Sequence, residues 1–297
     1  MRTLKQLIPA LTVSDGAGVK IKRSIGQKAK LHIDPFLMLD CFGSAQADDY
    51  IAGFPAHPHR GFETVTYMLD GHMLHEDHLG NKGHLKSGGV QWMTAGRGII
   101  HSEMPQQESG LMRGFQLWLN LPAAEKMKEA AYVDITPEQI PVARPTPAIW
   151  VKVIAGTFHY QQQSWAGPIQ GLSTEPLYLD IGLAAGSRLQ IAIPEGHAAV
   201  LYPYEGAVRL EAEPQSDIPE HHAAELSHTG ELVISAQQNL RVLLLAAKPI
   251  NEPVVQYGPF VMNTVEEIQQ AIQDYQQDKL TAGKSLASIK VHTLVGE

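Results

Sequence analysis

Short runs of β-branched and aromatic residues, separated by turn-forming residues, recur along the whole chain. Thr64–Leu69, Gly114–Leu119 and Trp150–Ile154 are three such runs, and 26 glycines and 19 prolines are spread over the full length. Runs of this kind between glycine and proline are typical of antiparallel strands. The pattern therefore predicts an all-β protein, built as a sandwich or a barrel.

One interruption of this pattern lies near the middle of the chain. Pro122–Ala131 is rich in Ala, Glu, Lys and Met, residues that favour helix, and it predicts a short helix. Pro137, Pro141, Pro145 and Pro147 follow it closely. Closely spaced prolines favour a stiff, extended segment, so we expect an interdomain linker over residues 135–147.

A second interruption lies near the end of the chain. Thr264–Glu267 has the sequence of a capping box, in which the threonine hydroxyl and the glutamate cap each other's backbone amides. Apolar residues then recur at helical spacing, at Ile268, Ala271, Ile272 and Tyr275. This pattern predicts a C-terminal α-helix from about Val265 to Lys279.

The two halves of the chain resemble each other in two places. Tyr67–Gly71 resembles Tyr202–Gly206, and Gly89–Met93 resembles Gly230–Ile234. A length of 297 residues suggests two domains at roughly 150 residues each. Together these observations predict a duplicated fold, two tandem antiparallel β-barrels followed by the terminal helix.

Composition excludes several classes of protein. Hydrophobic residues make up 44% of the chain and charged residues 18%, a balance typical of a folded protein. The net charge of −8 disfavours direct binding to nucleic acid. The single cysteine, Cys41, excludes an intramolecular disulfide and a cysteine-rich zinc site. Neither Met1–Val13 nor Val242–Ala247 is apolar for long enough to signal export or a membrane helix, so we expect a soluble, cytoplasmic protein.

The candidate chemistry lies in two histidine-containing motifs, among 14 histidines in all. His57 and His59 are two residues apart, as are His101 and Glu103, and alternate residues of a strand share a face. Two paired strands could therefore bring three imidazoles and one carboxylate to one point, a donor set that favours Fe(II) or Mn(II). Glu63 has the same parity as His57 and His59. It could replace Glu103 as a ligand, or it could orient an imidazole.

Other polar and aromatic residues receive a simpler interpretation. We interpret His72, His75, His78 and His84 as members of a polar strand-and-loop stretch outside the metal site, and His221 and His222 as part of an acidic loop. Cys41 is expected to be a small buried apolar residue. Arg60 could attract an anionic substrate or be a solvated surface cation. Phe54 and Trp92 could line an aromatic pocket, but packing in the core is the preferred interpretation.

The motifs together resemble a known family, the pirins, a branch of the cupin superfamily. His57–Val65 and Gln91–Pro105 resemble the pirin signature, and Glu252–Thr264 is similar to the pirin C-terminal domain. The resemblance implies a bicupin, with a metal-binding barrel over 1–134, the linker over 135–147, and a barrel without metal plus the terminal helix over 148–297.

The resemblance also implies the ligands of one mononuclear metal ion, namely His57, His59, His101 and Glu103. General cupins commonly carry Asn or a similar residue after the third histidine, where this chain has the pirin-type Glu103, which favours Glu103 over Glu63. In the second half, the positions equivalent to His57, His59 and Glu63 fall on Ala192, Pro194 and Ala198, so one metal per chain is expected.

The function implied by the resemblance is that of an Fe(II)-dependent quercetin 2,3-dioxygenase, which cleaves the ring of a flavonol. In that role Glu103 is also the candidate general base, since a carboxylate at the metal could accept the proton of the flavonol 3-hydroxyl. The alternative is a non-enzymatic regulator whose iron senses redox state and which binds a transcription factor or a metabolic enzyme. In either case we expect a monomer.

Overall fold

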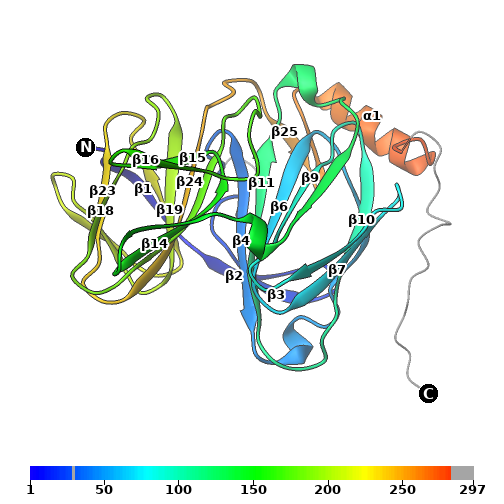
Figure 1. Ribbon diagram of the computed structural model, residues 1–297. Coiled ribbons are helices and arrows are strands. Elements are labelled where there is room, and N and C mark those ends of the chain that lie inside the picture. Colours follow the sequence, from blue (N-terminus) through cyan, green and yellow to red (C-terminus); the bar gives the residue numbers. More distant parts are fainter. Residues whose placement is uncertain (29–30, 282–297) are drawn as a thin grey trace.

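The computed structural model describes residues 1–28 and 31–281, which form two β-rich halves side by side (Figure 1). Each half pairs a seven-stranded antiparallel sheet with a four-stranded one. In the first half the large sheet contains, in order, β12 (Ala131–Ile135), β9 (Val90–Thr94), β6 (Phe62–Asp70), β11 (Met112–Asn120), β4 (Phe36–Ser44), β3 (Val19–Arg23) and β2 (Leu11–Asp15). The small sheet contains β5 (Phe54–His59), β10 (Ile99–Pro105), β7 (His72–Asp77) and β8 (Lys82–Lys86).

The second half repeats this arrangement. Its large sheet contains β1 (Leu4–Pro9), β22 (His222–Leu226), β19 (Ala198–Glu205), β24 (Leu240–Ala247), β17 (Leu177–Leu183), β14 (Ile149–Ala155) and β13 (Val142–Thr146). Its small sheet contains β18 (Arg188–Ile191), β23 (Leu232–Ser235), β20 (Val208–Leu210) and β21 (Ser216–Ile218). Two hairpins complete the strands, β15 (Thr157–Tyr160) with β16 (Gln163–Ala166) and β25 (Val255–Tyr257) with β26 (Phe260–Met262). The predicted all-β, two-barrel fold is confirmed.

Of the two sequence matches between the halves, one joins strands that occupy equivalent positions in the fold and the other does not. Tyr67–Gly71 ends β6 and Tyr202–Gly206 ends β19, and these two strands hold the same position in their sheets. Gly89–Met93, however, belongs to β9 of a large sheet, whereas Gly230–Ile234 leads into β23 of a small sheet. The second match therefore arises from similar strand composition rather than from equivalent positions.

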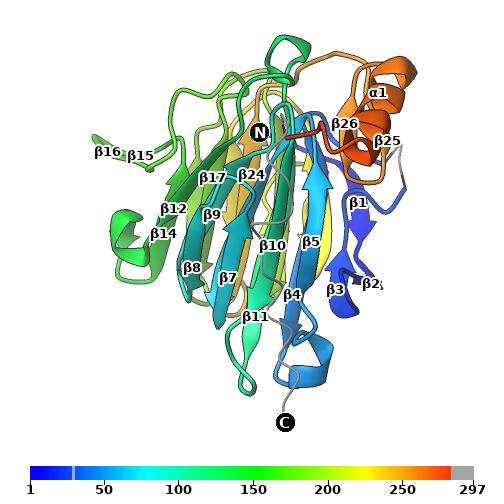
Figure 2. The same ribbon diagram turned by 90° about the vertical axis from the view of Figure 1, so that its right-hand side faces the viewer.

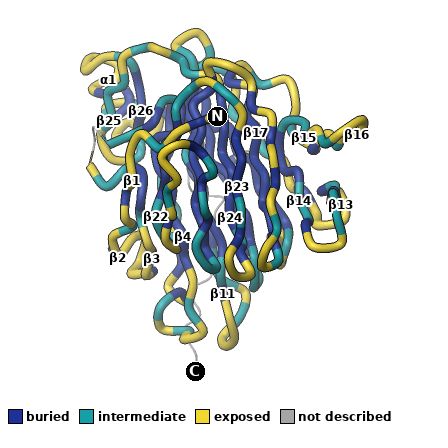
Figure 3. The backbone as a smooth tube through the Cα atoms, turned by 90° about the vertical axis from the view of Figure 1, so that its left-hand side faces the viewer, coloured by how far each residue is buried: buried dark blue, intermediate teal, exposed yellow. Residues whose placement is uncertain are grey.

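The two large sheets pack face to face and form the boundary between the halves. Tyr67 and Phe115 from the first half meet Tyr178 and Leu243 from the second in one buried cluster. The central strands are accordingly buried along most of their length, while exposed residues gather in the loops (Figure 3). Within this boundary the carboxylate of Asp180 is fully buried and accepts hydrogen bonds from the hydroxyls of Tyr67, over 2.7 Å, and Tyr204, over 2.5 Å.

The chain ends cross between the halves. β1 pairs with β22 of the second half, and part of the expected linker forms β13 at the edge of the same sheet. At the other end, β25, β26 and the helix α1 (Val265–Gln276) lie against the first half (Figure 2). The domain boundaries at residues 134 and 148 stay a prediction, and residues 282–297 of the expected second domain lie outside the described residues.

The helix predicted over Pro122–Ala131 is wrong. The segment contains only a 3-10 turn at Ala123–Glu125, and β12 begins at Ala131; another 3-10 turn spans Pro137–Gln139 and a third Ala47–Asp49. Tertiary contacts override helix propensity here. The Lys128 carbonyl accepts the Arg97 amide, and the Lys126 side chain is buried against backbone carbonyls, contacts that an α-helix would break.

The predicted C-terminal helix is confirmed, with its end at Gln276 instead of Lys279. Thr264 caps the amide of Glu267, and the Glu267 side chain returns to the Thr264 amide, as the capping box predicts. Ile268 and Ala271 are buried against Ile100 of β10. Among the described residues, no helix is both long and apolar enough to cross a membrane.

Candidate metal centre

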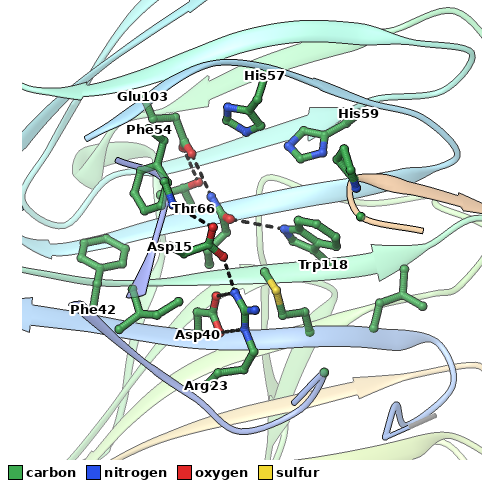
Figure 4. Close-up of a pocket in the computed structure, with 18 of the residues that line it drawn as sticks. Asp15, Arg23, Asp40, Phe42, Phe54, His57, His59, Thr66, Glu103 and Trp118 are labelled. Carbon is green, nitrogen blue, oxygen red and sulfur yellow. Dashed lines mark hydrogen bonds and ion pairs between the residues drawn. The ribbon is translucent and has the colours of Figure 1, made fainter. Parts of the chain in front are cut away.

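Two adjacent strands bring three histidines together at one end of the first barrel. His57 and His59 lie on β5, and His101 of β10 is paired directly with His57. Because alternate residues of a strand share a face, His57 and His59 project to the same side, as expected (Figure 4). One ring nitrogen from each of the three histidines lies within 4.8 Å of the others.

The chemistry of these nitrogens fits a divalent metal ion. His57 Nδ1 donates to the carbonyl of Pro55 over 2.8 Å, which leaves Nε2 with a free lone pair. His59 Nδ1 and His101 Nε2 are buried and have no hydrogen-bond partner in the protein. Burial, reinforced by the neighbouring His57 ring, lowers the pKa of His59 and of His101 well below its usual value. Buried nitrogens are normally bonded, so unpartnered lone pairs on neutral imidazoles suit a cation.

Glu103 lies on β10, two residues after His101, and its carboxylate is held by two hydrogen bonds. Its Oε1 accepts from Thr66 Oγ1 over 2.9 Å, and its Oε2 accepts from Gln116 Nε2 over 2.8 Å. The pairing of β10 with β5 shifts register between His101 and Glu103. The Glu103 carboxylate lies outside the group formed by the three imidazoles, so its role as a fourth ligand stays a prediction.

Glu63 faces away from the histidines. Its carboxylate accepts from Thr94 Oγ1 over 2.6 Å and from Trp92 Nε1 over 3.0 Å, and Lys128 Nζ is 3.8 Å away. The two roles considered for Glu63, a metal ligand or a partner of an imidazole, are therefore not found. The reason is a corner at Gly61, with φ of +90°, which ends β5 and starts β6 in the other sheet. Strand parity does not continue through such a corner.

Two of the four histidines assigned to a polar strand-and-loop stretch outside the metal site are buried. His75 is 1% exposed, and its Nδ1 lies 3.3 Å from Nδ1 of His101. His78 is also buried. His72 and His84 lie on the outward side, where His72 Nε2 and His84 Nδ1 are 2.9 Å apart. Strand alternation could have indicated the burial of His75, because His75 lies two residues after the apolar Met73 on β7 and therefore shares its buried face.

His57 and His59 form part of the wall of a cavity of about 650 Å³. Phe54 and Trp118 contribute aromatic walls, and Trp118 stands edge-on to His59 with ring centres 5.3 Å apart (Figure 4). Phe54 therefore lines the pocket, whereas Trp92 is buried outside it, bonded to Glu63. The volume lies within the roughly 300–1,000 Å³ range of small-molecule sites. Trp118 is a pocket residue that the sequence analysis missed.

One side of the cavity contains the guanidinium of Arg23, whose charge is balanced by two carboxylates. Arg23 Nε and Nη2 bind the two oxygens of Asp40 over 2.8 and 2.7 Å, and Nη2 also binds Asp15 over 2.6 Å. Burial lowers the pKa of Arg23, but these two carboxylates outweigh it and leave the pKa raised. The guanidinium is therefore engaged within the protein.

The C-terminal strap, residues 253–280, covers part of the cavity. Gln256, Gly258 and Pro259 of the strap belong to its lining. Arg60, next to His59, is 4% exposed and forms an ion pair with Asp274 of α1 over 2.7 Å. Arg60 is thus neither a substrate-attracting group nor a surface cation, the two roles considered for it, and it fastens the strap to the strand that carries His57 and His59.

The second barrel has an apolar interior. Its β18 and β23 correspond by sheet position to β5 and β10, and they contribute Leu189, Ile191, Leu232 and Ile234 to an aliphatic core. Within residues 1–28 and 31–281, the group of His57, His59 and His101 is the one histidine, cysteine and carboxylate cluster with metal-ligand spacing. Cys41 is buried, and burial raises its pKa to about 12, which confirms the small apolar residue that was expected.

Comparison with known proteins agrees with this fold. The pirin family matches residues 18–119, and the pirin C-terminal cupin domain matches residues 178–281. A Pseudomonas aeruginosa protein, whose name places it provisionally among the quercetin 2,3-dioxygenases, is 53% identical over 94% of this chain and 98% of its own length.

Two solved structures show the same architecture. A quercetin 2,3-dioxygenase from Acinetobacter baumannii superposes with a TM-score of 0.85 at 32% identity, covering 95% of this chain and 99% of that one. A bacterial pirin from Escherichia coli, solved in complex with nickel(II), shares the fold with a TM-score of 0.61 at 18% identity, covering 84% and 99%. The matches extend over both halves, and the chain belongs to the pirin family of cupin-type proteins.

Proposed function

We propose that this chain binds one divalent metal ion, Fe(II) in the first instance, and is a dioxygenase that cleaves a flavonol-like ring, as quercetin 2,3-dioxygenases do. The observation that carries the proposal is the convergence of three imidazoles, two of which, those of His57 and His59, lie in the wall of a cavity of about 650 Å³. His57, His59 and His101 would hold the ion, with Glu103 as the fourth ligand. When bound, the ion would supply a Lewis-acid centre at which a substrate oxygen anion and dioxygen can meet.

The protein's own contribution is to orient the substrate and to accept its proton. Phe54 and Trp118 offer aromatic surfaces against which a flat ring system can pack. A Glu103 oxygen would accept the proton of the flavonol 3-hydroxyl, because Thr66 and Gln116 each donate to this carboxylate and fix its direction. Trp118 Nε1 donates to Gln116 Oε1 over 3.3 Å, so one pocket wall is linked to the group that orients Glu103.

The strap would separate the reacting atoms from solvent on one side. Pro259 and Gly258 lie in the cavity lining, next to the strand of His57 and His59. The ion pair of Arg60 with Asp274 keeps this segment in place. Excluding water strengthens the electrostatic interactions within such a site.

The test is anaerobic reconstitution with Fe(II), followed by measurement of oxygen consumption, carbon monoxide release and products with quercetin. Ni(II) and Mn(II) are loaded in parallel, and metal content is measured for each. His101→Ala should lose both metal and turnover, whereas His84→Ala, an outward-facing histidine, should keep both.

Two outcomes would redirect the proposal. Stoichiometric metal without turnover on any flavonol would favour the alternative, a redox-sensing regulator that acts on protein partners. For the role of Glu103 as base, Glu103→Gln should retain most of the metal and lose turnover. Full turnover in this variant would remove that role.

A further inference from the structure

A second histidine and an aspartate stand behind the metal-site histidine His101. His75 and Asp77 lie on β7, which pairs with β10 so that Asp77 is opposite His101 and His75 is opposite Glu103. Both side chains are buried, with exposures of 1% and 3%. His75 also stacks on Tyr132, with ring centres 4.4 Å apart. Neither His75 nor Asp77 belongs to the proposed ligand set.

The contacts among these groups fix where each imidazole proton lies. His101 Nδ1 and His75 Nδ1 are 3.3 Å apart, so one must donate and the other accept. His101 Nε2 is the unpartnered nitrogen that a metal ion would use, and it must therefore carry a lone pair. The proton of neutral His101 then sits on Nδ1 and points to His75.

The same reasoning continues to Asp77. Because His75 Nδ1 accepts, the proton of neutral His75 sits on Nε2. That nitrogen has no hydrogen-bond partner in the protein, but the negatively charged Asp77 Oδ2 lies 3.6 Å away, a distance at which attraction favours the N–H on this side. Asp77 is itself held by the amides of Leu79 and Asn81, over 2.9 and 3.0 Å. His101, His75 and Asp77 thus form a series in which each proton points toward an acceptor, through a hydrogen bond at His101 Nδ1 and through electrostatic attraction at His75 Nε2. His101 Nε2 is left with its lone pair free.

We propose that Asp77 and His75 are positioning residues that set the tautomer and orientation of His101 and thereby prepare it for metal. The inference rests on the metal-binding part of the proposed function and not on its dioxygenase chemistry. Groups that accept the second N–H of a metal-bound imidazole orient the ring and raise its basicity, and their loss typically lowers metal affinity roughly 10- to 100-fold.

The first test uses the metal-free protein and measures tautomers directly. In wild type, ¹⁵N chemical shifts of the imidazoles should show His101 with its proton on Nδ1 and His75 with its proton on Nε2. In His75→Phe, which can keep the stacking on Tyr132 but loses both nitrogens, His101 should populate the Nε2–H form. The matched control is His72→Phe on the outward face of the same strand, which should leave the His101 signals unchanged.

The second test measures affinity for Co(II) by competition with a chromophoric chelator. We expect His75→Phe to weaken binding at least tenfold and to alter the visible spectrum of the Co(II) site, with His72→Phe unchanged. Wild-type affinity in His75→Phe, together with a retained Nδ1–H tautomer of His101, would overturn the proposal. If wild type binds no Co(II), the proposed metal site fails, and the tautomer measurement still decides whether the series exists.

A further variant guards against misfolding of His75→Phe. Asp77→Asn keeps an oxygen for the backbone amides of Leu79 and Asn81, and it can place an NH₂ group at the Oδ2 position, which faces His75 Nε2 and now accepts from Asn81 Nδ2 over 2.8 Å. Two donors would then face each other, so His75 should shift its proton to Nδ1 and His101 to Nε2. Unchanged tautomers in a folded Asp77→Asn protein would remove Asp77 from the series.

Discussion

A buried lysine near β5, the strand of His57 and His59, gives a quantitative prediction for the dependence of stability on pH. Lys126 is 1% exposed, and its Nζ donates to the Gly61 carbonyl over 2.7 Å, to Asn120 Oδ1 over 2.6 Å and to the Val261 carbonyl over 3.1 Å. Gly61 forms the corner between β5 and β6, and Val261 belongs to the strap. Lys126 thus joins the strand of His57 and His59 to the segment that covers the cavity.

Burial lowers the pKa of Lys126 from 10.5 to about 8, against the raising effect of Glu252 and Glu267. Between these two values the unfolded chain binds the proton and the folded chain has released it. The free energy of unfolding therefore rises with pH across this window. From pH 7 to pH 9.5 the contribution of Lys126 increases by about 2 kcal/mol, since each unit of pKa difference corresponds to about 1.4 kcal/mol.

The assay compares urea unfolding of wild type and Lys126→Met, both metal-free, at several pH values between 7 and 9.5. The unfolding free energy of wild type minus that of Lys126→Met should increase by about 2 kcal/mol as the pH rises over this range. Other titrating groups, including the buried tyrosines, contribute to both proteins and cancel in the difference. Lys128→Met controls for the loss of one positive charge in the same loop. Parallel pH profiles for wild type and Lys126→Met would refute the reasoning, because they would mean that the three acceptors fully offset the cost of burial.

Three further predictions concern the boundary between the halves, the terminal helix and the pocket. Asp180→Ala should lower the unfolding free energy by roughly 3 kcal/mol, because the buried hydroxyls of Tyr67 and Tyr204 lose their acceptor. Asp217→Ala, at an exposed carboxylate, should lower it far less, and equal losses for the two variants in urea unfolding would contradict this. Thr264→Ala should cost about 1 kcal/mol, measured as faster hydrogen exchange in α1, and unchanged exchange would show that packing alone sets the helix start. Trp118→Leu should raise the KM for quercetin several-fold in the reconstituted protein, while an unchanged KM would place the substrate elsewhere.

Local sequence determined the features that depend on neighbours along the chain. The strand runs Thr64–Leu69 and Gly114–Leu119 lie within β6 and β11, and the capping box of Thr264 starts α1 where predicted. His57 and His59 share a face because strand alternation acts over two residues. The apolar second barrel also follows from sequence, since no ligand types occupy its equivalent positions.

Tertiary structure decided the features that depend on residues far apart. Propensity favoured a helix over Pro122–Ala131, but Lys126 and Lys128 are held by contacts with Gly61 and Arg97 from other loops. Glu63 turned away from the histidines because the corner at Gly61 moves the chain from one sheet to the other. Strand parity predicts a face only within one strand, so no local pattern could locate this break.

The surroundings of the candidate metal site also divide into features set by local sequence and features set by tertiary structure. The motifs identified the histidines, but only folding placed His75 against His101 and brought the strap, about 200 residues further along the chain, to the cavity wall. Pairing of β1 with β22 likewise joins segments about 220 residues apart. Sequence encodes which residues can bind a metal through their type and local spacing. Long-range packing decides which residues orient these ligands and which residues enclose them. Burial and strand pairing act there between segments far apart in the chain, and the local sequence of one segment does not indicate its partner.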